Sequence, residues 1–476
     1  MKLFAGNTFR NGGFKNILRS FVEGPGNIRE LLGIALPMVI SQACETVMMF
    51  TDRLFLSRLG GVHMNAAMGG GLTCFLFMTF FIGTTGYANA LVAQYYGAGQ
   101  REKCPLVVTQ GAILALLGAL LLLGTLPLGR LFFVFSRVPE EQVALQVAYF
   151  NIVMMGAGIA LLRNVLSCFF SGIGKTPIVM GASLFSMLVN VGANYVLVFG
   201  KLGFPALGVR GAAYGTLIGG VAGLLVILGA YLSRENRRTY GVLEALRFDR
   251  TIMKLLLRLG YPAGLELFLN LFAFTSMVMA FHSYGIAVGA AATIALNWDM
   301  VSFIPLVGMN IAITSLVGRY MGAGKPDAAH RVTMGGLRLA FCYSGVLLLI
   351  FASMPETLVQ VFRPREASLA FESMLPTATF MVRLISFYVL ADAVGTVFSG
   401  ALRGAGDTFW AMILSVGTHW FLALSVIGAI RIFHVPPEAS WSILVSMVFF
   451  IGGAFYLRYR GGAWRTLRVI SCEGDA

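Results

Sequence analysis

Charged residues are scarce in this chain. Only 12% of its 476 residues are Asp, Glu, Lys or Arg, whereas soluble proteins carry about 25%. Hydrophobic residues make up 57% of the chain. This composition excludes the soluble and disordered classes, and it places the protein in a membrane.

The lack of charge is concentrated in long stretches. Most of them approach the ~20 residues that a helix needs to cross the hydrocarbon core. The stretches without any Asp, Glu, Lys or Arg are residues 59–100, 104–129, 142–162, 176–200, 211–233, 267–298, 300–318, 339–355, 408–430 and 439–457. Two further segments with few charges are 28–51 and 370–396. With the longer runs split at glycine-rich turns, the pattern predicts an all-α polytopic membrane protein of twelve transmembrane helices.

The sequence also lacks the residue patterns that are typical of metal sites, nucleotide-binding loops and catalytic sites. Its six cysteines include no pair at metal-ligand spacing, and we interpret them as small apolar fillers. Residues 171–177, SGIGKTP, contain the GKT of a phosphate loop, but Phe169 stands where that loop requires glycine. We find neither a metal cluster nor a nucleophile with its base. Nucleotide binding is therefore rejected, a membrane-embedded enzyme is disfavoured, and energy must come from an ion gradient or a partner.

The net charge of +14 has a topological explanation. In a soluble protein it would suggest nucleic acid binding. Here the basic residues lie between the predicted helices, above all in residues 233–250, SRENRRTYGVLEALRFDR. Cytoplasmic segments of membrane proteins are enriched in Lys and Arg. The bias predicts a multi-pass protein of the inner (plasma) membrane with both termini in the cytoplasm, and nucleic acid is not needed to explain the charge.

The chain repeats itself. The motif VAQYYGAGQ at residues 92–100 returns as VGRYMGAGK at residues 317–325, close to half the chain further on. SGIGKTP returns at a similar offset as RGAGDTF at residues 403–409. A duplication of roughly 200 apolar residues is typical of transporters built from two similar lobes. We interpret the repeated motifs as tight cytoplasmic connections, where glycine tolerates positive φ.

The repeat sets the expected domain organisation. We expect a cytoplasmic lead-in at 1–27, an N-lobe of helices 1–6 at 28–232, a cytoplasmic linker at 233–250, a C-lobe of helices 7–12 at 251–459 and a cytoplasmic tail at 460–476. The lead-in contains no apolar core of signal-peptide length. Pro37 and Pro262, which share the offset of the first motif pair, lie early in the first helix of each lobe. A proline inside a helix bends it, either as a static kink or as a hinge used during transport.

Charged side chains inside the predicted helices are the candidate site, because each costs at least ~2.5 kcal/mol at the centre of the membrane. Asp392 is the strongest candidate, because residues 384–402 contain no other charge. Thr396 and Ser399 follow on the same helical face. A carboxylate backed by hydroxyls offers oxygen ligands for Na⁺ or a site for a proton. The alternative is a carboxylate paired with a neighbouring Arg for structure alone.

Further candidates lie in both lobes. Glu266 comes four residues before Asn270 and four after Pro262, so the three share a face. We assign cation binding or coupling to Asp392, Glu266, Asp299, Asn270 and Glu45, with Na⁺ most simply held by Asp392 and Glu266. Asp52 lies on the same face as Glu45 but beside Arg53, and we interpret it as a structural capping or pairing residue. We expect Arg163 to snorkel or pair, and His419 to be a packing residue.

Long stretches of the chain resemble one transporter family. In the first lobe these are LPMVISQACETVMMFTDRLFLSRLGG at residues 36–61, VAQYYGAG, SGIGKTP and residues 189–216. In the second they are IALNWDMVSFIPLVGMNIAITSLVGRYMGAG and DAVGTVFSGALRGAGDT. Over residues 28–460 the chain resembles the multidrug and toxic compound extrusion (MATE) family. The resemblance implies two pseudo-symmetric six-helix lobes around a V-shaped cavity, and export of organic cations in exchange for Na⁺ or H⁺.

The resemblance also implies roles for single residues. The acidic residue of the family's helix ten falls on Asp392, and those of helix one fall on Glu45 and Asp52. The chain departs from the family three times. The helix-seven Glu of the sodium-coupled branch would fall on Asn270, asparagines replace the helix-five carboxylate of many relatives, and Asp299 replaces what is usually a small polar residue. The residues expected to line the substrate cavity are Trp298, Tyr388, Asn190 and Asn194.

The favoured interpretation is a secondary antiporter that exports cationic amphipathic compounds by alternating access of its lobes. It would be a monomer whose partners are small organic cations and membrane lipid, with no cofactor besides the coupling ion. The alternative is a flippase for lipids or lipid-linked oligosaccharides from the related superfamily. Such cavities tend to be lined with Arg, whereas the intramembrane charges here are mainly acidic.

Overall fold

The computed structural model describes residues 24–135, 140–363 and 369–470, and within these ranges the regular structure is entirely helical. The predicted lead-in therefore lies largely outside the described residues, as does the end of the predicted tail after residue 470. The helices are α2 (Ile28–Ser57), α3 (Gly61–Gly86), α4 (Ala88–Gly97), α5 (Lys103–Leu123), α6 (Leu126–Phe135), α7 (Glu140–Met155), α8 (Ala157–Gly172), α9 (Thr176–Phe199), α10 (Val209–Tyr231), α11 (Arg234–Tyr240), α12 (Arg250–His282), α13 (Ile286–Gly322), α14 (Pro326–Ser353), α15 (Pro355–Gln360), α16 (Leu369–Ala405), α17 (Thr408–Arg431), α18 (Pro437–Arg460) and the 3₁₀ helix η1 (Ala463–Thr466).

The helices confirm the predicted membrane fold. Eleven spans in the described part of the chain are long and apolar enough to cross a bilayer, with α3 and α4 counted as one. Helices α7 and α8 are apolar enough together but are bent by 45° at their junction, so the described residues hold eleven spans, or the predicted twelve if this pair is one span. The protein is therefore an all-α, multi-pass membrane protein.

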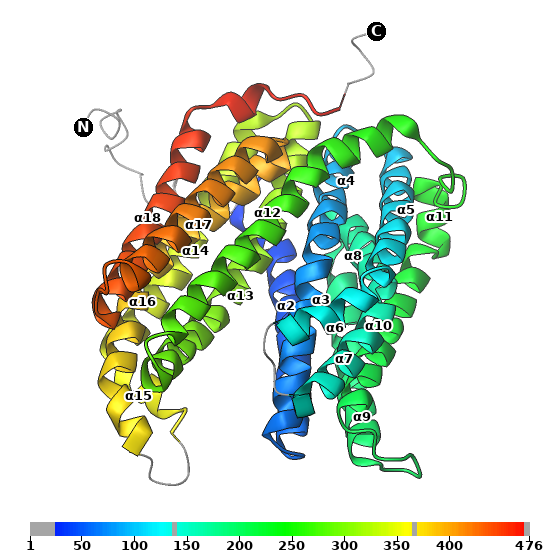
Figure 1. Ribbon diagram of the computed structural model, residues 1–476. Coiled ribbons are helices and arrows are strands. Elements are labelled where there is room, and N and C mark those ends of the chain that lie inside the picture. Colours follow the sequence, from blue (N-terminus) through cyan, green and yellow to red (C-terminus); the bar gives the residue numbers. More distant parts are fainter. Residues whose placement is uncertain (1–23, 136–139, 364–368, 471–476) are drawn as a thin grey trace, which may run out of the picture.

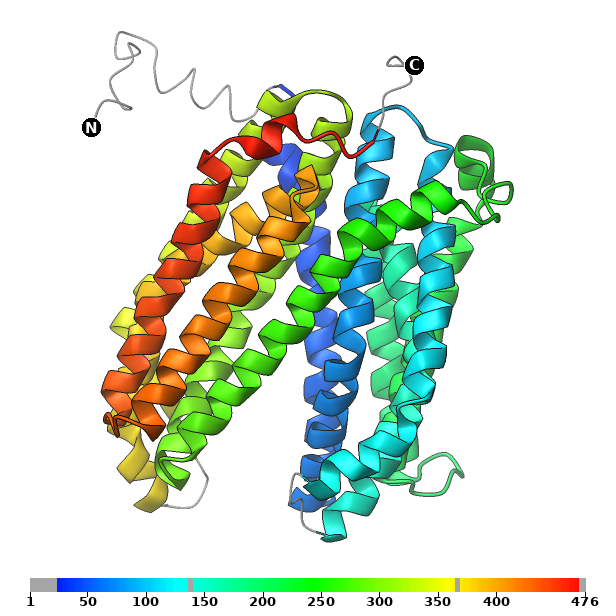
Figure 2. The same ribbon diagram turned by 45° about the horizontal axis from the view of Figure 1, so that its top comes forward.

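The helices gather in two bundles, one of α2–α11 and one of α12–α18 (Figures 1 and 2). The bundles meet where α2 and α4 pack on α13 and where α3 packs on α12. Helices α2 and α12 continue through Pro37 and Pro262. The exact lobe boundaries and the role of the two prolines as hinges stay predictions.

The repeated motifs form the turns that were expected of them. Gly99 and Gly324, in the first motif pair, have φ angles of 80° and 68°. Gly174 and Gly406, in the second pair, have φ angles of 81° and 97°. A side chain at these angles would strain the backbone, which explains the glycines.

The same motifs also join the two bundles. A Cβ atom on Gly97 would overlap the backbone carbonyl of Arg319, and a Cβ on Gly322 would overlap that of Gln94. Gln94 and Arg319 hold the same place in the two copies of the motif, as do Gly97 and Gly322, so the two contacts are related by the internal repeat. We refer to Gln94, Gly97, Arg319 and Gly322 as the inter-lobe contact.

Hydrogen bonds extend the inter-lobe contact in the same paired way. Gln94 Nε2 donates to the carbonyl of Gly404 in the other bundle over 2.8 Å. Arg319 Nη2 donates to the carbonyl of Ile173 over 2.9 Å. Each copy of the first motif therefore binds the second motif of the opposite bundle. These contacts lie at the upper end of Figure 1, where α4 and α13 end.

Candidate functional site

The carboxylates inside the spans fall into two groups according to their partners. Glu45 pairs with Arg163 over 2.7 Å, and Glu266 pairs with Arg403 over 2.6 Å. The other three carboxylates that were singled out in the sequence form no ion pair with any described residue, and they are Asp52, Asp299 and Asp392. A carboxylate in the membrane needs a compensating partner. These three are therefore the positions where an added cation or proton is favoured most.

Asp52 lies in a polar cluster of the first bundle. The carboxylate, 7% exposed on α2, accepts hydrogen bonds from Asn194 Nδ2 on α9 and, over 3.1 Å, from Thr216 Oγ1 on α10. Asn194 Nδ2 also donates to Asn190 Oδ1 over 3.3 Å. Three helices thus surround one carboxylate with two amides and a hydroxyl.

Glycines on α10 allow this close packing. A Cβ atom on Gly215 would overlap Asn194 Oδ1, and one on Gly219 would come within 2.7 Å of the Cβ of Asn190. Asn190 and Asn194 are one turn apart on α9, so both face Asp52. Asn194 Oδ1 is buried and has no hydrogen-bond partner, which leaves one oxygen of the cluster unused.

The second bundle holds a pair of carboxylates. Asp299 on α13 interacts electrostatically with Tyr388 on α16. Asp392, one turn after Tyr388, interacts electrostatically with Asp299, and no hydrogen bond from a described residue reaches it. Both carboxylates are half-buried, and Tyr388 is buried. Two like charges without a basic partner repel each other, and a bound cation or a proton would relieve that repulsion.

The other predicted residues have partners of their own. Asn270 Nδ2 donates to Ser415 Oγ on α17 over 2.8 Å. Trp298 Nε1 donates to the carbonyl of Leu358 over 3.1 Å. No hydrogen bond or ion pair between described residues joins Glu266 to Asp299 or Asp392. The proposed Na⁺ ligands Asp392 and Glu266 are thus not linked directly, and the assignment stays a prediction.

Of the two hydroxyls predicted to support Asp392, that of Ser399 hydrogen-bonds elsewhere. Ser399 Oγ accepts from Asn310 Nδ2 on α13 over 3.2 Å and donates to the carbonyl of Thr396 over 3.1 Å. His419 Nδ1 lies 2.7 Å from the carbonyl of Ser415, as expected of a packing residue.

Two features of the site were missed in the sequence. Asp52, interpreted as a structural capping or pairing residue, forms no ion pair with Arg53, and its partners Asn194 and Thr216 come from other helices. Thr216 was not singled out, although a hydroxyl in an otherwise apolar span was a usable signal. Among the described residues no three His, Cys, Asp or Glu side chains gather in a way that could hold a metal ion. The oxygen-rich clusters suit Na⁺ or a proton better than a transition metal.

Comparison with known proteins identifies the family. The family model MatE matches residues 37–196 and 262–426. The two matches begin at Pro37 and Pro262, so each covers one copy of the internal repeat. The chain belongs to the MATE family. MATE proteins are transporters and not enzymes, and the resemblance seen in the sequence is confirmed.

Several MATE relatives cover nearly the whole chain. A probable multidrug resistance protein NorM from Thermotoga maritima is 26% identical over 469 residues, which are 97% of this chain and 98% of the relative. The multidrug resistance protein PmpM from Pseudomonas aeruginosa is 28% identical over 435 residues, 88% of each chain.

Solved structures show the same fold. A MOP superfamily transporter from Pyrococcus furiosus superimposes with a TM-score of 0.84 at 21% identity, over 94% of this chain and 98% of the other. A MATE family transporter in an outward-facing conformation gives a TM-score of 0.83 at 20% identity, with the same coverage.

Proposed function

We propose that this MATE protein exports cationic, amphipathic small molecules in exchange for Na⁺ or H⁺. The multidrug resistance proteins among its relatives support the substrate class. Ion coupling is supported by one observation above all: Asp52, Asp299 and Asp392 lack a basic partner among the described residues, whereas Glu45 and Glu266 have one.

In this mechanism the coupling ion binds where negative charge is in excess. A cation between Asp299 and Asp392 removes their repulsion and stabilises the packing of α13 on α16. An organic cation near the same carboxylates competes for that charge. Linkage is reciprocal, so substrate weakens ion binding by the same factor by which the ion weakens substrate binding.

Alternating access requires that the inter-lobe contact opens and closes. We propose that both termini lie in the cytoplasm, as the basic linker suggests, in the inner membrane. The inter-lobe contact then closes the cytoplasmic side, and the described conformation is open toward the outside. Transport would separate Gly97 from Arg319 and Gly322 from Gln94.

The halves of α2, α3, α12 and α13 that lie away from the inter-lobe contact expose large apolar side chains. They include Met49, Phe50, Met68, Phe75, Phe272, Met279, Met300 and Phe303. Methionine and phenylalanine suit flat, apolar cations, because they adapt in shape and attract positive charge to the ring face. We propose that part of this surface guides the substrate.

Transport by the reconstituted protein tests the proposal. Proteoliposomes would be loaded with a fluorescent organic cation and driven separately by a Na⁺ gradient and by a pH gradient. We expect one gradient to drive export, and the Asp392→Asn variant to lower it by about tenfold or more. The proposal would be wrong if neither gradient drove export, or if the Asp392→Asn variant exported the cation as fast as the unmodified protein. The flippase alternative is not favoured, since Arg163 and Arg403 are each paired with a carboxylate.

A further inference from the structure

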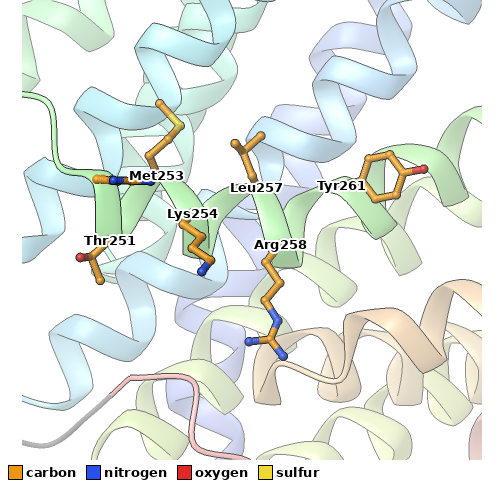
Figure 3. A pocket seen from close by; sticks show the side chains of 7 residues that line it. Thr251, Met253, Lys254, Leu257, Arg258 and Tyr261 are labelled. Carbon is orange, nitrogen blue, oxygen red and sulfur yellow. The ribbon is translucent and has the colours of Figure 1, made fainter.

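The first half of α12 carries an unusual concentration of positive charge. Arg250, Lys254 and Arg258 follow one another at four-residue spacing, so they share one face of the helix. Figure 3 shows Lys254 and Arg258 pointing to the same side. Together with Thr251, Met253, Leu257 and Tyr261 they line an open cleft of about 1020 Å³. We call this surface the α12 cleft.

The charges of the α12 cleft are not compensated by the protein. All three basic side chains are exposed, and none forms a hydrogen bond or ion pair with a described residue. No Asp or Glu occurs between Arg250 and Tyr261. Like charges at this spacing destabilise a helix. An anion bound in the cleft would remove that repulsion.

Exposed apolar side chains accompany the charges. Leu257 is 42% exposed and Tyr261 is 51% exposed. Just before the helix, Leu246 and Phe248 are 67% and 62% exposed. Basic residues interleaved with exposed apolar and aromatic ones are typical of a helix at the membrane–water boundary. On a helix face that is surrounded by water alone, exposed apolar side chains next to the charges would not be expected.

The length of α12 fits this position. Its 33 residues extend over about 50 Å at 1.5 Å per residue, about 20 Å more than the hydrocarbon core. The excess corresponds to about 13 residues, close to the stretch from Arg250 to Pro262. Figure 1 shows the helix crossing obliquely over the bundles from its start beside α5.

We infer that the α12 cleft binds the headgroup of an anionic phospholipid. The phosphate is held by Arg250, Lys254 and Arg258, and an acyl chain lies along Leu257 and Tyr261. A free inorganic anion would satisfy the charges but would leave the exposed apolar side chains uncovered. An anionic lipid matches both parts of the cleft.

Native mass spectrometry of the full chain in detergent tests this inference. The protein would be titrated with phosphatidylglycerol or phosphatidylcholine, and bound lipids would be counted. Neutralising the cleft with Arg250→Gln, Lys254→Gln and Arg258→Gln should weaken phosphatidylglycerol binding at least about tenfold and leave phosphatidylcholine binding unchanged. A matched control removes three exposed charges outside the cleft, with Arg234→Gln, Arg238→Gln and Lys325→Gln, and should change binding less than about threefold.

Single variants keep the test valid if the triple variant does not fold. Lys254→Glu should lose phosphatidylglycerol binding, whereas Lys254→Arg should retain it. Equal losses in the cleft and control variants, or equal binding of the two lipids, would overturn the inference. Full displacement of phosphatidylglycerol by millimolar inorganic phosphate would overturn it too, because the site would then be one for a free anion.

Discussion

The two bundles hold their unpaired carboxylates in opposite ways. In the first bundle Asp52 stands alone and receives hydrogen bonds from an amide and a hydroxyl. In the second, Asp299 and Asp392 interact with each other, and no hydrogen bond from a described residue reaches the Asp392 side chain. Donors stabilise an ionised carboxylate, whereas a second carboxylate destabilises it. The second cluster therefore gains more from a cation than the first.

The repeat does not extend to these carboxylates. At the offset of the first motif pair, the counterpart of Asp52 in the second copy is Met277, and the counterpart of Asp299 in the first copy is Cys74. The glycine turns, by contrast, match in both copies. Duplication thus supplied the backbone turns and the paired inter-lobe contact, while the chemistry of each bundle diverged. We expect the second bundle to dominate ion coupling.

Removing the excess charge of the second bundle should have the largest effect. Asp392→Asn abolishes the like-charge pair, and we expect gradient-driven export to fall by about tenfold or more. Asp52→Asn provides the matched variant in the first bundle, with a smaller expected loss. Initial rates of dye export from proteoliposomes measure both. An equal or larger loss for Asp52→Asn would reverse the order of the two sites.

Filling the inter-lobe contact should come next. Gly97→Val forces a side chain against the Arg319 backbone, which costs about 1–3 kcal/mol in the closed arrangement. The equilibrium between molecules with a closed inter-lobe contact and molecules with an open one should therefore shift toward the open form by about tenfold. Pulsed electron paramagnetic resonance between spin labels at Arg238 and Arg460, one in each bundle, would report a longer distance.

The control for the inter-lobe contact is a glycine with free space. A Cβ on Gly181 would meet no atom within 4 Å, so Gly181→Ala should leave the distance distribution unchanged. If Gly97→Val also leaves it unchanged, the inter-lobe contact does not hold the two bundles together.

Paired and unpaired carboxylates should differ in stability as well as in transport. Glu266→Gln leaves the partly exposed Arg403 without its partner and should lower stability by about 1–3 kcal/mol. Asp392→Asn removes a repulsion and should not lower it. Thermal unfolding in detergent measures both variants. Adding Arg403→Gln to Glu266→Gln should recover part of the loss, and no recovery would mean that the pair does not act as one unit.

The sequence predicts local features of this fold better than its site. The spans can be predicted from local hydropathy. The turns at Gly99 and Gly324 can be predicted because their backbone has a positive φ, which glycine tolerates. The surroundings of Asp52 depend on partners 142 and 164 residues away. Glu266 likewise meets Arg403 across 137 residues. Such contacts depend on which helix faces pack together, and spacing along one helix does not reveal that.

The smallest effect should come from the hydroxyl beside Asp52. Thr216→Val keeps the shape of the side chain but removes one hydrogen bond to the carboxylate, while Asn194 still donates. We expect export to fall only about twofold to tenfold, since one hydrogen bond typically makes a net contribution of about 0.5–1.5 kcal/mol. Thr109→Val is the control, because that hydroxyl bonds only to its own helix at Pro105. If Thr216→Val lowered export as much as Asp392→Asn does, ion coupling would depend on the first bundle. The expectation that the second bundle dominates ion coupling would then be wrong.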